Sequence, residues 1–157
     1  MFTLGKIALS AAFVAVAAQL GAVTIEKVGT RNFSEEDLTS LREYLGAGEQ
    51  TGGRCYLRTD PSQKAGRYFI VDTDEPLSSL PADGKVVLEL VMAKDGQATT
   101  IELALADSIG TKGQVLYLGL TDKLRDEDIL AWRISFRDAS NKVLSQSHSF
   151  LWEMPEE

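Results

Sequence analysis

The chain has 157 residues, of which 44% are hydrophobic and 25% are charged, with 13 glycines and 4 prolines. These proportions are those of one ordinary folded domain, and they exclude disordered, collagen-like and disulfide-stapled chains. A single cysteine and a single histidine exclude an internal disulfide and a multi-histidine metal site. The formal net charge of −7 disfavours nucleic acid as a partner, because phosphates require a basic surface.

The first residues follow the order of a secretory signal peptide. Lys6 supplies a positive charge, Ile7–Ala18 is an apolar run, and small residues suited to cleavage lie at the end of this run, Ala15-Val16-Ala17, and just after it, Leu20-Gly21-Ala22. We therefore expect a signal peptide within residues 1–22 that is cleaved near residue 17 or 22. Cleavage leaves a periplasmic or secreted protein without membrane insertion. The alternative is an uncleaved anchor, but the apolar run is shorter than the ~20 residues that cross a bilayer.

Residues 23–53 are expected to hold a strand, one short N-terminal helix and a glycine-rich connector. The strand begins with the β-like stretch Val23–Val28, and Ser34 is a suitable N-cap that three acidic residues follow. Phe33 and Leu38 occupy the two positions of a hydrophobic staple. The residues that would line one face of the helix are Leu38, Leu41 and Leu45. Gly46 then ends the helix, whose apolar face we expect to cover an edge or an end of the core.

Residues 54–157 predict a β domain, because apolar and polar residues alternate in short runs between turn residues. Turns are expected at Lys94–Gln97 and at Asp138–Lys142, and the last strand is expected to reach Trp152. The residues expected to face the core are Val86, Leu88, Leu90, Met92, Ile101, Leu103, Leu105, Leu116, Leu118, Leu120, Trp132, Ile134 and Phe136. Short strands without intervening helices predict a mainly β fold, an antiparallel Ig-like sandwich of two sheets.

Five short segments of this domain carry a resemblance to known sequences. They are Ala65–Phe69, Pro76–Leu80, Leu118–Thr121, Ala131-Trp132 and Ser149–Trp152. These segments resemble a group of short exported bacterial proteins of the verrucomicrobial type. The resemblance implies an exported Ig-like β-sandwich, and it implies no activity, ligand or functional residue.

His148 lies between Ser147 and Ser149, an arrangement that suggests nucleophilic catalysis with an acid supplied from elsewhere. Strand alternation argues against this chemistry. It places His148 on the same side as Leu144 and Phe150 and turns both serines to the opposite side. We therefore expect a structural histidine at an apolar face and no catalytic residue here.

Two further features could suggest reactive or cofactor chemistry. Residues 46–53 read Gly-Ala-Gly-Glu-Gln-Thr-Gly-Gly, but a nucleotide-binding loop has one residue fewer between its second and third glycines and opens a helix. We expect a connector there and no cofactor. Cys55 has no neighbouring base in the sequence to activate its thiol, so we expect a buried cysteine.

Two acidic clusters are candidates for a metal such as calcium, whose ligands are oxygen atoms. They are Asp72, Asp74 and Glu75 after one strand, and Asp126, Glu127 and Asp128 before another. Neither cluster has the spacing of a helix-loop-helix calcium site, so each could supply only part of a coordination shell. Solvated loop charge is the default, unless the fold brings both clusters to the same end.

Aromatic and arginine side chains are enriched in interfaces, and they single out a candidate binding face. Its residues are Tyr56, Tyr68, Tyr117, Arg54, Arg58 and Arg67. We expect a non-enzymatic exported module that binds a protein, a glycan or an envelope component through loops at one end or through a strand edge. The alternatives are a structural envelope or assembly subunit, which predicts exposed strand edges, and a small metal-dependent hydrolase.

Overall fold

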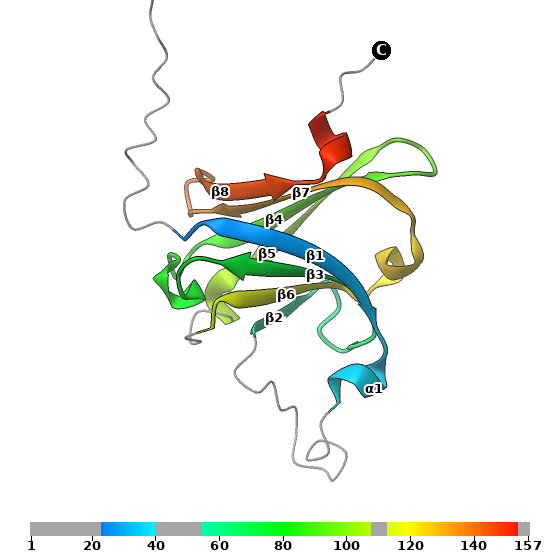
Figure 1. Cartoon of the computed structure of the whole chain (residues 1–157), viewed down its shortest axis with the longest axis horizontal. Helices are drawn as coiled ribbons and strands as arrows, with labels where there is room; N and C mark the ends of the chain where they lie inside the picture. The colour runs from blue at the N-terminus through cyan, green and yellow to red at the C-terminus, as the bar shows by residue number, and fades with distance from the viewer. Residues whose placement is uncertain (1–22, 40–54, 108–112, 154–157) are drawn as a thin grey trace, which may run out of the picture.

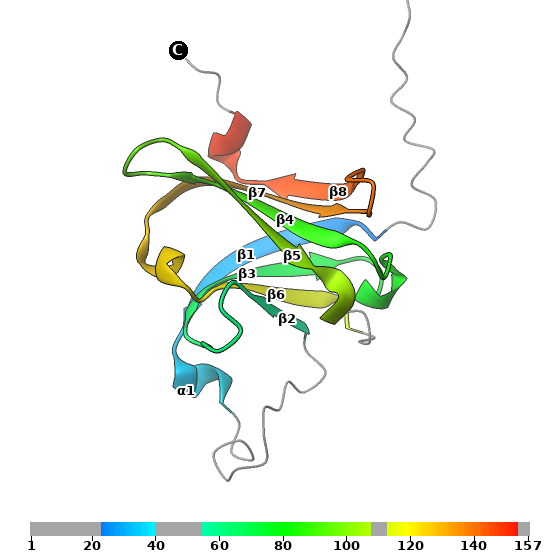
Figure 2. The same ribbon diagram turned by 180° about the vertical axis from the view of Figure 1, so that it is seen from behind.

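The computed structural model describes residues 23–39, 55–107 and 113–153. The chain forms two four-stranded sheets that pack face to face, with strand orders β1-β3-β6-β2 and β5-β4-β7-β8 (Figure 1; Figure 2). The strands are β1 (Ile25–Phe33), β2 (Cys55–Arg58), β3 (Gly66–Thr73), β4 (Lys85–Met92), β5 (Ala98–Ala104), β6 (Val115–Leu120), β7 (Ile129–Arg137) and β8 (Val143–His148). The prediction of a mainly β, two-sheet fold is confirmed.

The core lies between the two sheets and is built by the residues whose alternation predicted inner faces. Val86 and Leu90 of β4 are fully buried, and so is Phe136 of β7. The two predicted hairpins both form, since β4 pairs with β5 and β7 pairs with β8 in antiparallel register. Gly96 has a positive φ of 65°, as the turn between β4 and β5 requires.

The prediction of a purely antiparallel fold is wrong at one strand. β2 pairs in parallel with β6, so that Cys55 lies opposite Leu116 and Tyr56 lies opposite Tyr117. β1 and β3 pair with each other, although β2 lies between them in the sequence, and β2 therefore occupies the far edge of their sheet. A strand of four residues is too short for its alternation to indicate direction or partner.

The expected N-terminal helix is reduced to one turn in the described part of the chain, α1 (Glu35–Leu38). Its start is as predicted, because Ser34 Oγ accepts the N–H of Asp37 and the Asp37 carboxylate accepts the N–H of Ser34. Thr39 is already extended and no residue of α1 is buried, so α1 does not cover the core. Local capping fixes where a helix begins, whereas its length depends on a packed face.

Several other expectations fall on residues outside the described ranges. They are the signal peptide of residues 1–22, Leu41 and Leu45 of the helix, the connector of residues 46–53, and Arg54. The remaining helical segments are the 3-10 turns η2 (Leu77–Ser79), η3 (Leu105–Asp107), η4 (Lys123–Asp126) and η5 (Phe150–Glu153). No helix in the described ranges is long and apolar enough to cross a membrane.

Two glycines allow close packing between β3 and β6. A Cβ atom on Gly66 would lie 2.1 Å from the carbonyl oxygen of Leu120, and one on Gly119 would lie 2.6 Å from the ring of Tyr68. Tyr68 is opposite Gly119 in the strand pairing and is fully buried. The tyrosine ring therefore lies across the glycine backbone, an arrangement that a larger residue at 119 would prevent.

We expect Gly119→Ala to lower the free energy of unfolding by about 1–3 kcal/mol, because the added methyl group overlaps the ring of Tyr68. Gly29→Ala is the matched control, since a Cβ atom there meets nothing within 4 Å. Denaturant unfolding of both variants measures the difference. Equal stability of the two variants would show that the Tyr68 ring moves aside without cost.

A paired glutamate and arginine lie on the outer face of the sheet that contains β4 and β7. Arg133 donates two hydrogen bonds to the Glu89 carboxylate, from Nε at 2.5 Å and from Nη2 at 2.7 Å. Nη2 of Arg137 lies 3.8 Å from the same carboxylate. The hydrogen bonds from Arg133 lower the pKa of Glu89 below its ordinary value, against an opposing effect of partial burial.

The sign of the pH dependence follows from this lowered pKa. The pair contributes stability that is complete well above the ordinary pKa of glutamate, 4.5, and that is lost as pH falls through the folded pKa. We expect Glu89→Gln to cost about 1 kcal/mol at neutral pH and less in acid. Unfolding curves at neutral and acidic pH measure both losses. Glu127→Gln is the control, because it removes a more exposed ion pair, the one with Lys94. An equal loss of stability for Glu89→Gln at both pH values would contradict the prediction.

Candidate functional site

Four of the six residues predicted to form a binding face lie together on the outer face of the β1-β3-β6-β2 sheet. The rings of Tyr56 and Tyr117 are 4.9 Å apart between centroids, and Tyr68 meets Tyr56 edge-on at 6.3 Å. The Arg58 guanidinium lies over the Tyr56 ring, 4.7 Å from its centroid. Phe33, which the sequence suggested only as part of a helix staple, joins the group through an edge contact with Tyr68 at 5.3 Å.

This aromatic cluster of Phe33, Tyr56, Tyr68 and Tyr117 is packed against itself. The Tyr68 hydroxyl donates to the carbonyl oxygen of Lys64 at 2.6 Å and accepts from Nε of Arg58 at 2.8 Å. The most central ring is therefore buried and its polar atom is satisfied within the chain. We assign the aromatic cluster a structural role, because it fastens β2 and the loop that follows β2 to the sheet.

Arg67 is not part of the aromatic cluster, although it is next to Tyr68 in the sequence. Successive residues of β3 point to opposite faces, so Arg67 lies on the inner side, at the end of the sandwich where β3 begins. Its Nη1 donates to the carbonyl oxygen of Glu127 at 3.0 Å. Three adjoining surface hollows, of about 510, 360 and 140 Å³, all have Arg67 in their lining.

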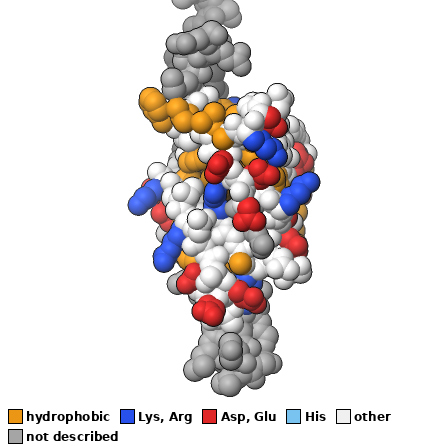
Figure 3. Space-filling view, turned by 90° about the vertical axis from the view of Figure 1, so that its right-hand side faces the viewer, with side chains coloured by type: hydrophobic (Ala, Val, Ile, Leu, Met, Phe, Trp, Pro, Cys, Tyr) orange, Lys and Arg blue, Asp and Glu red, His pale blue; other side chains and the backbone are white. Residues whose placement is uncertain are grey.

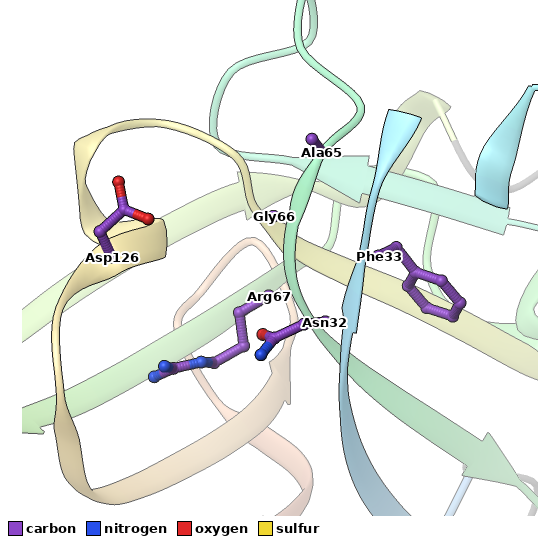
Figure 4. Close-up of a pocket in the computed structure, with 6 residues that line it drawn as sticks. All are labelled: Asn32, Phe33, Ala65, Gly66, Arg67 and Asp126. Carbon is purple, nitrogen blue, oxygen red and sulfur yellow. The ribbon is translucent and has the colours of Figure 1, made fainter. Parts of the chain in front are cut away.

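We call these three together the Arg67 hollow. The side chains in its lining that offer polar or aromatic groups include Thr30, Asn32, Arg67, Asp126, Asp128, Trp132 and Ser149. In Figure 4 the Asn32 amide lies beside the side chain of Arg67, Asp126 lies across from them on η4, and the Phe33 ring turns to the other side of β1. Figure 3, which views the molecule from the right-hand side of Figure 1, shows side chains of both charges and, above them, exposed hydrophobic side chains.

Two rings from different sheets line the part of the hollow that has a volume of about 360 Å³. Phe69 of β3 and Trp132 of β7 meet edge to face, with their centroids 5.6 Å apart. Ile129 and Leu130 complete the apolar lining, and Leu130 is 51% exposed. An apolar floor beneath a rim of donors and acceptors is typical of a ligand-binding site.

Hydrogen bonds hold the loop that carries the acidic side of the hollow. The hydroxyl of Thr121, a buried residue, donates to the carbonyl of Asp60 at 2.8 Å and accepts the N–H of the same residue at 2.9 Å. Asp122 caps η4 through its carboxylate, and the N–H of Ala93 donates to the carbonyl of Asp128 at 2.9 Å. These bonds fix the walls of the hollow, which reduces the ordering that binding would require.

The two acidic clusters lie at opposite ends of the sandwich. Asp74 accepts the N–H of Thr24, just before β1 begins, whereas the carbonyl of Glu127 binds Arg67 at the end where β3 begins. The eight residues of β3 separate these ends by ~25 Å. The fold thus does not bring Asp72, Asp74 and Glu75 together with Asp126, Glu127 and Asp128. Among the described residues, no three His, Cys, Asp or Glu side chains form a group that could hold a metal ion.

The face predicted for His148 is wrong. His148 pairs with Arg133 on the outer face of its sheet, while Ser147 is on the inner face. A β-bulge at Leu144 shifts the alternation of β8 by one residue, so Leu144 packs against the core and His148 does not share its side. Nδ1 of His148 lies 3.0 Å from the carbonyl oxygen of Ser149, a backbone contact.

The structure also tests the predictions for Cys55 and for the end of the last strand. Cys55 is 2% exposed and belongs to the core, as expected. The last strand ends at His148 and does not reach Trp152, because the next residues form η5, in which the N–H of Trp152 donates to the carbonyl of Ser149. Phe150 on this turn is 86% exposed.

No protein-family model matches this chain, and neither the curated proteins nor the solved structures that were searched contain a match. The chemistry of the Arg67 hollow therefore follows from its own side chains. They supply hydrogen-bond donors, hydrogen-bond acceptors and an aromatic surface within one concave region.

Proposed function

We propose that this protein is a non-enzymatic, exported binding module whose Arg67 hollow binds a neutral glycan. One observation carries the proposal: Arg67 lines all three parts of the hollow. Within the described ranges, its guanidinium makes one hydrogen bond, to the backbone carbonyl of Glu127. An arginine has five N–H donors, so this side chain retains donors for a ligand.

The surroundings of Arg67 favour a neutral polyhydroxyl ligand over an anion. Arg67 and Asn32 supply donors, while the carboxylates of Asp126 and Asp128 supply acceptors that would repel a phosphate or a carboxylate. Sugar hydroxyls both donate and accept hydrogen bonds, so they suit a mixed set of partners. Trp132 adds an apolar surface against which the C–H face of a sugar ring can pack.

The positions of the reactive side chains support binding without catalysis. His148 contacts the backbone on the outer face of its sheet, and Cys55 lies in the core. Neither residue lines the Arg67 hollow. A nucleophile and its base must lie within hydrogen-bond reach of one another, and these two residues belong to different sheets.

We also infer that the sandwich is Ig-like in topology. When β2 is set aside, β1-β3-β6 corresponds to the strand order A-B-E, and β4-β7-β8 corresponds to C-F-G with β5 in the C′ place. β2 takes the edge place of strand D, but it comes from another point of the chain and runs parallel to its neighbour. The Arg67 hollow lies among the connections that match A–B, C–C′ and E–F, the end opposite to an antibody's binding loops. The glycan proposal therefore rests on the side chains of the hollow and not on analogy with antibodies.

A protein partner is the second candidate, because large apolar side chains are exposed near the hollow. Phe150 is 86% exposed, Leu151 is 43% exposed, and Leu130 at the rim of the hollow is 51% exposed. Apolar patches of this kind mark interaction surfaces in soluble proteins. A protein partner would depend on Phe150 more than on Arg67, which separates it from a glycan.

We expect the protein to bind at least one of a panel of soluble neutral oligosaccharides, such as cellohexaose, maltohexaose or chitohexaose. Arg67→Gln should weaken that binding by about tenfold or more, because it removes charged hydrogen bonds. Isothermal titration calorimetry of the wild-type and variant proteins measures the two dissociation constants.

Lys27→Gln is the control, since it removes one positive charge from the opposite end of β1, where Lys27 pairs with Asp72. Its affinity for the same oligosaccharide should equal that of the wild type. Binding that survives Arg67→Gln would place the ligand elsewhere. An equal loss of affinity in both variants would show that only the net charge of the protein matters.

Export is expected to remove the leader at or before residue 22. The order of Lys6, the apolar run and the small residues at Ala15-Val16-Ala17 supports cleavage, and Val23 is fully buried in the core, so removal of Val23 would be unfavourable. Expression of the whole chain in a bacterium, followed by N-terminal sequencing of periplasmic material, tests this. A chain that keeps Met1 and stays in the cytoplasm would refute export.

A further inference from the structure

The described strands include four sheet edges, and three of them carry features that oppose pairing with another chain. β2 has only four residues, and β1 has an irregular register next to Lys27 and carries three charged residues, Glu26, Lys27 and Arg31. β8 is bulged at Leu144, and its Ser145 hydroxyl accepts the N–H of Ile25 from β1. Short length, charge, bulges and coverage are the usual protections of edge strands.

β5 (Ala98–Ala104) lacks these protections. Its seven residues contain no proline, glycine or lysine, and they pair with β4 in an unbroken register. Ile101 and Leu103 face the core, and the outer face carries one charged residue, Glu102. The carboxylate of Glu102 is 3.1 Å from Nζ of Lys85, which offsets its charge. β5 is therefore a regular, weakly charged edge.

The hydrogen-bond phase of β5 shows which of its backbone groups face outward. The N–H of Met92 donates to the carbonyl of Gln97, and the N–H of Leu105 donates to the carbonyl of Gly84, so odd-numbered residues bond to β4. The residues that direct both backbone groups to the free edge are Ala98, Thr100, Glu102 and Ala104. Within the described ranges, no strand pairs with this edge.

We propose that β5 pairs in antiparallel register with β5 of a second copy of this chain, about a twofold axis at Ile101. The two four-stranded sheets would then join into one continuous sheet. Thr100 would lie opposite Glu102 of the second copy, and Ala98 would lie opposite Ala104. This proposal does not depend on the glycan proposed for the Arg67 hollow.

The residues of β5 favour this register over its neighbours. Antiparallel hydrogen bonds at the free edge can form only between residues whose backbone groups face outward, and these are every second residue of β5. Any alternative register is therefore shifted by two residues or by a multiple of two. A twofold axis at Glu102 would set two glutamates directly opposite each other, which is destabilising. An axis at Ile101 uses the whole strand, leaves each Glu102 opposite a threonine, and extends the apolar inner face from Ile101 and Leu103 into the second copy.

The first test is the solution mass of the protein. The full chain is expressed with its leader, the mass of the purified chain is found by mass spectrometry, and light scattering gives the mass in solution. We expect a concentration-dependent shift to twice the chain mass. Thr100→Pro should give a monomer, because proline removes an outward N–H and costs no bond to β4. A wild-type protein that stays monomeric, or a dimer that Thr100→Pro leaves intact, would overturn the proposal.

The second test uses two double variants that differ only at residue 98, and it holds even if the proline variant does not fold. Ala98→Lys with Ala104→Glu places opposite charges across the axis, whereas Ala98→Glu with Ala104→Glu places like charges there. Within one chain residue 98 faces Val91, so its charge has little effect on the monomer. We expect the first variant to dimerise with a dissociation constant at least about tenfold smaller. Equal constants would overturn the proposed pairing.

Discussion

The contact between Phe69 and Trp132 closes the core at one end of the sandwich, and the Arg67 hollow depends on it. The two rings come from different sheets and meet edge to face, so they fill the space between the sheets at this end. Arg67 is two residues before Phe69 on the same side of β3, a position that would otherwise be in the core. Because the rings end the core there, the guanidinium lies beyond them, where burial of a charge carries no large cost.

The walls of the hollow are fixed by contacts on the outside of the sheet. Gly119 leaves room for the Tyr68 ring, and the Tyr68 hydroxyl binds the carbonyl of Lys64 and so holds the loop after β2. The same loop binds Thr121 through Asp60, just before η4. η4 leads to Glu127, whose carbonyl accepts the bond from Arg67. The aromatic cluster thus contributes to the site indirectly, by holding the loops on which the site is built.

The sequence predicted those parts of the fold that depend on local patterns. The inner faces of β4 and β7 follow from strict alternation, the hairpin after Met92 follows from Asp95-Gly96, and the start of α1 follows from Ser34. Features that depend on non-local pairing were missed. The parallel pairing of β2 could not be inferred from four residues, and the bulge at Leu144 reverses the face of His148 without any proline or glycine to mark it.

The candidate site was predicted only in part, for a related reason. Composition pointed to tyrosines and arginines, but it could not tell which of them share a face. Alternation alone separates Arg67 from Tyr68, and this signal was present in the sequence. The partners of Arg67 in the hollow come from β1, η4 and β7, which are distant along the chain, so only the folded structure brings Asn32, Asp126 and Trp132 to it.

The hollow and the free edge of β5 are related by geometry. The turn between β4 and β5 lies at the hollow's end of the sandwich, where Ala93 and Lys94 contact the segment that carries Glu127 and Asp128. Ala98 is therefore near the hollow, and Ala104 is near the opposite end. Antiparallel pairing of two β5 strands would set Ala98 of one copy beside Ala104 of the other, so the two hollows would lie at opposite ends of the joined sheet. Such a dimer could not bind one short ligand with both hollows, but it could link two separate glycan chains. Binding of one hollow would then raise the effective concentration of glycan at the other hollow only where the two chains lie close together.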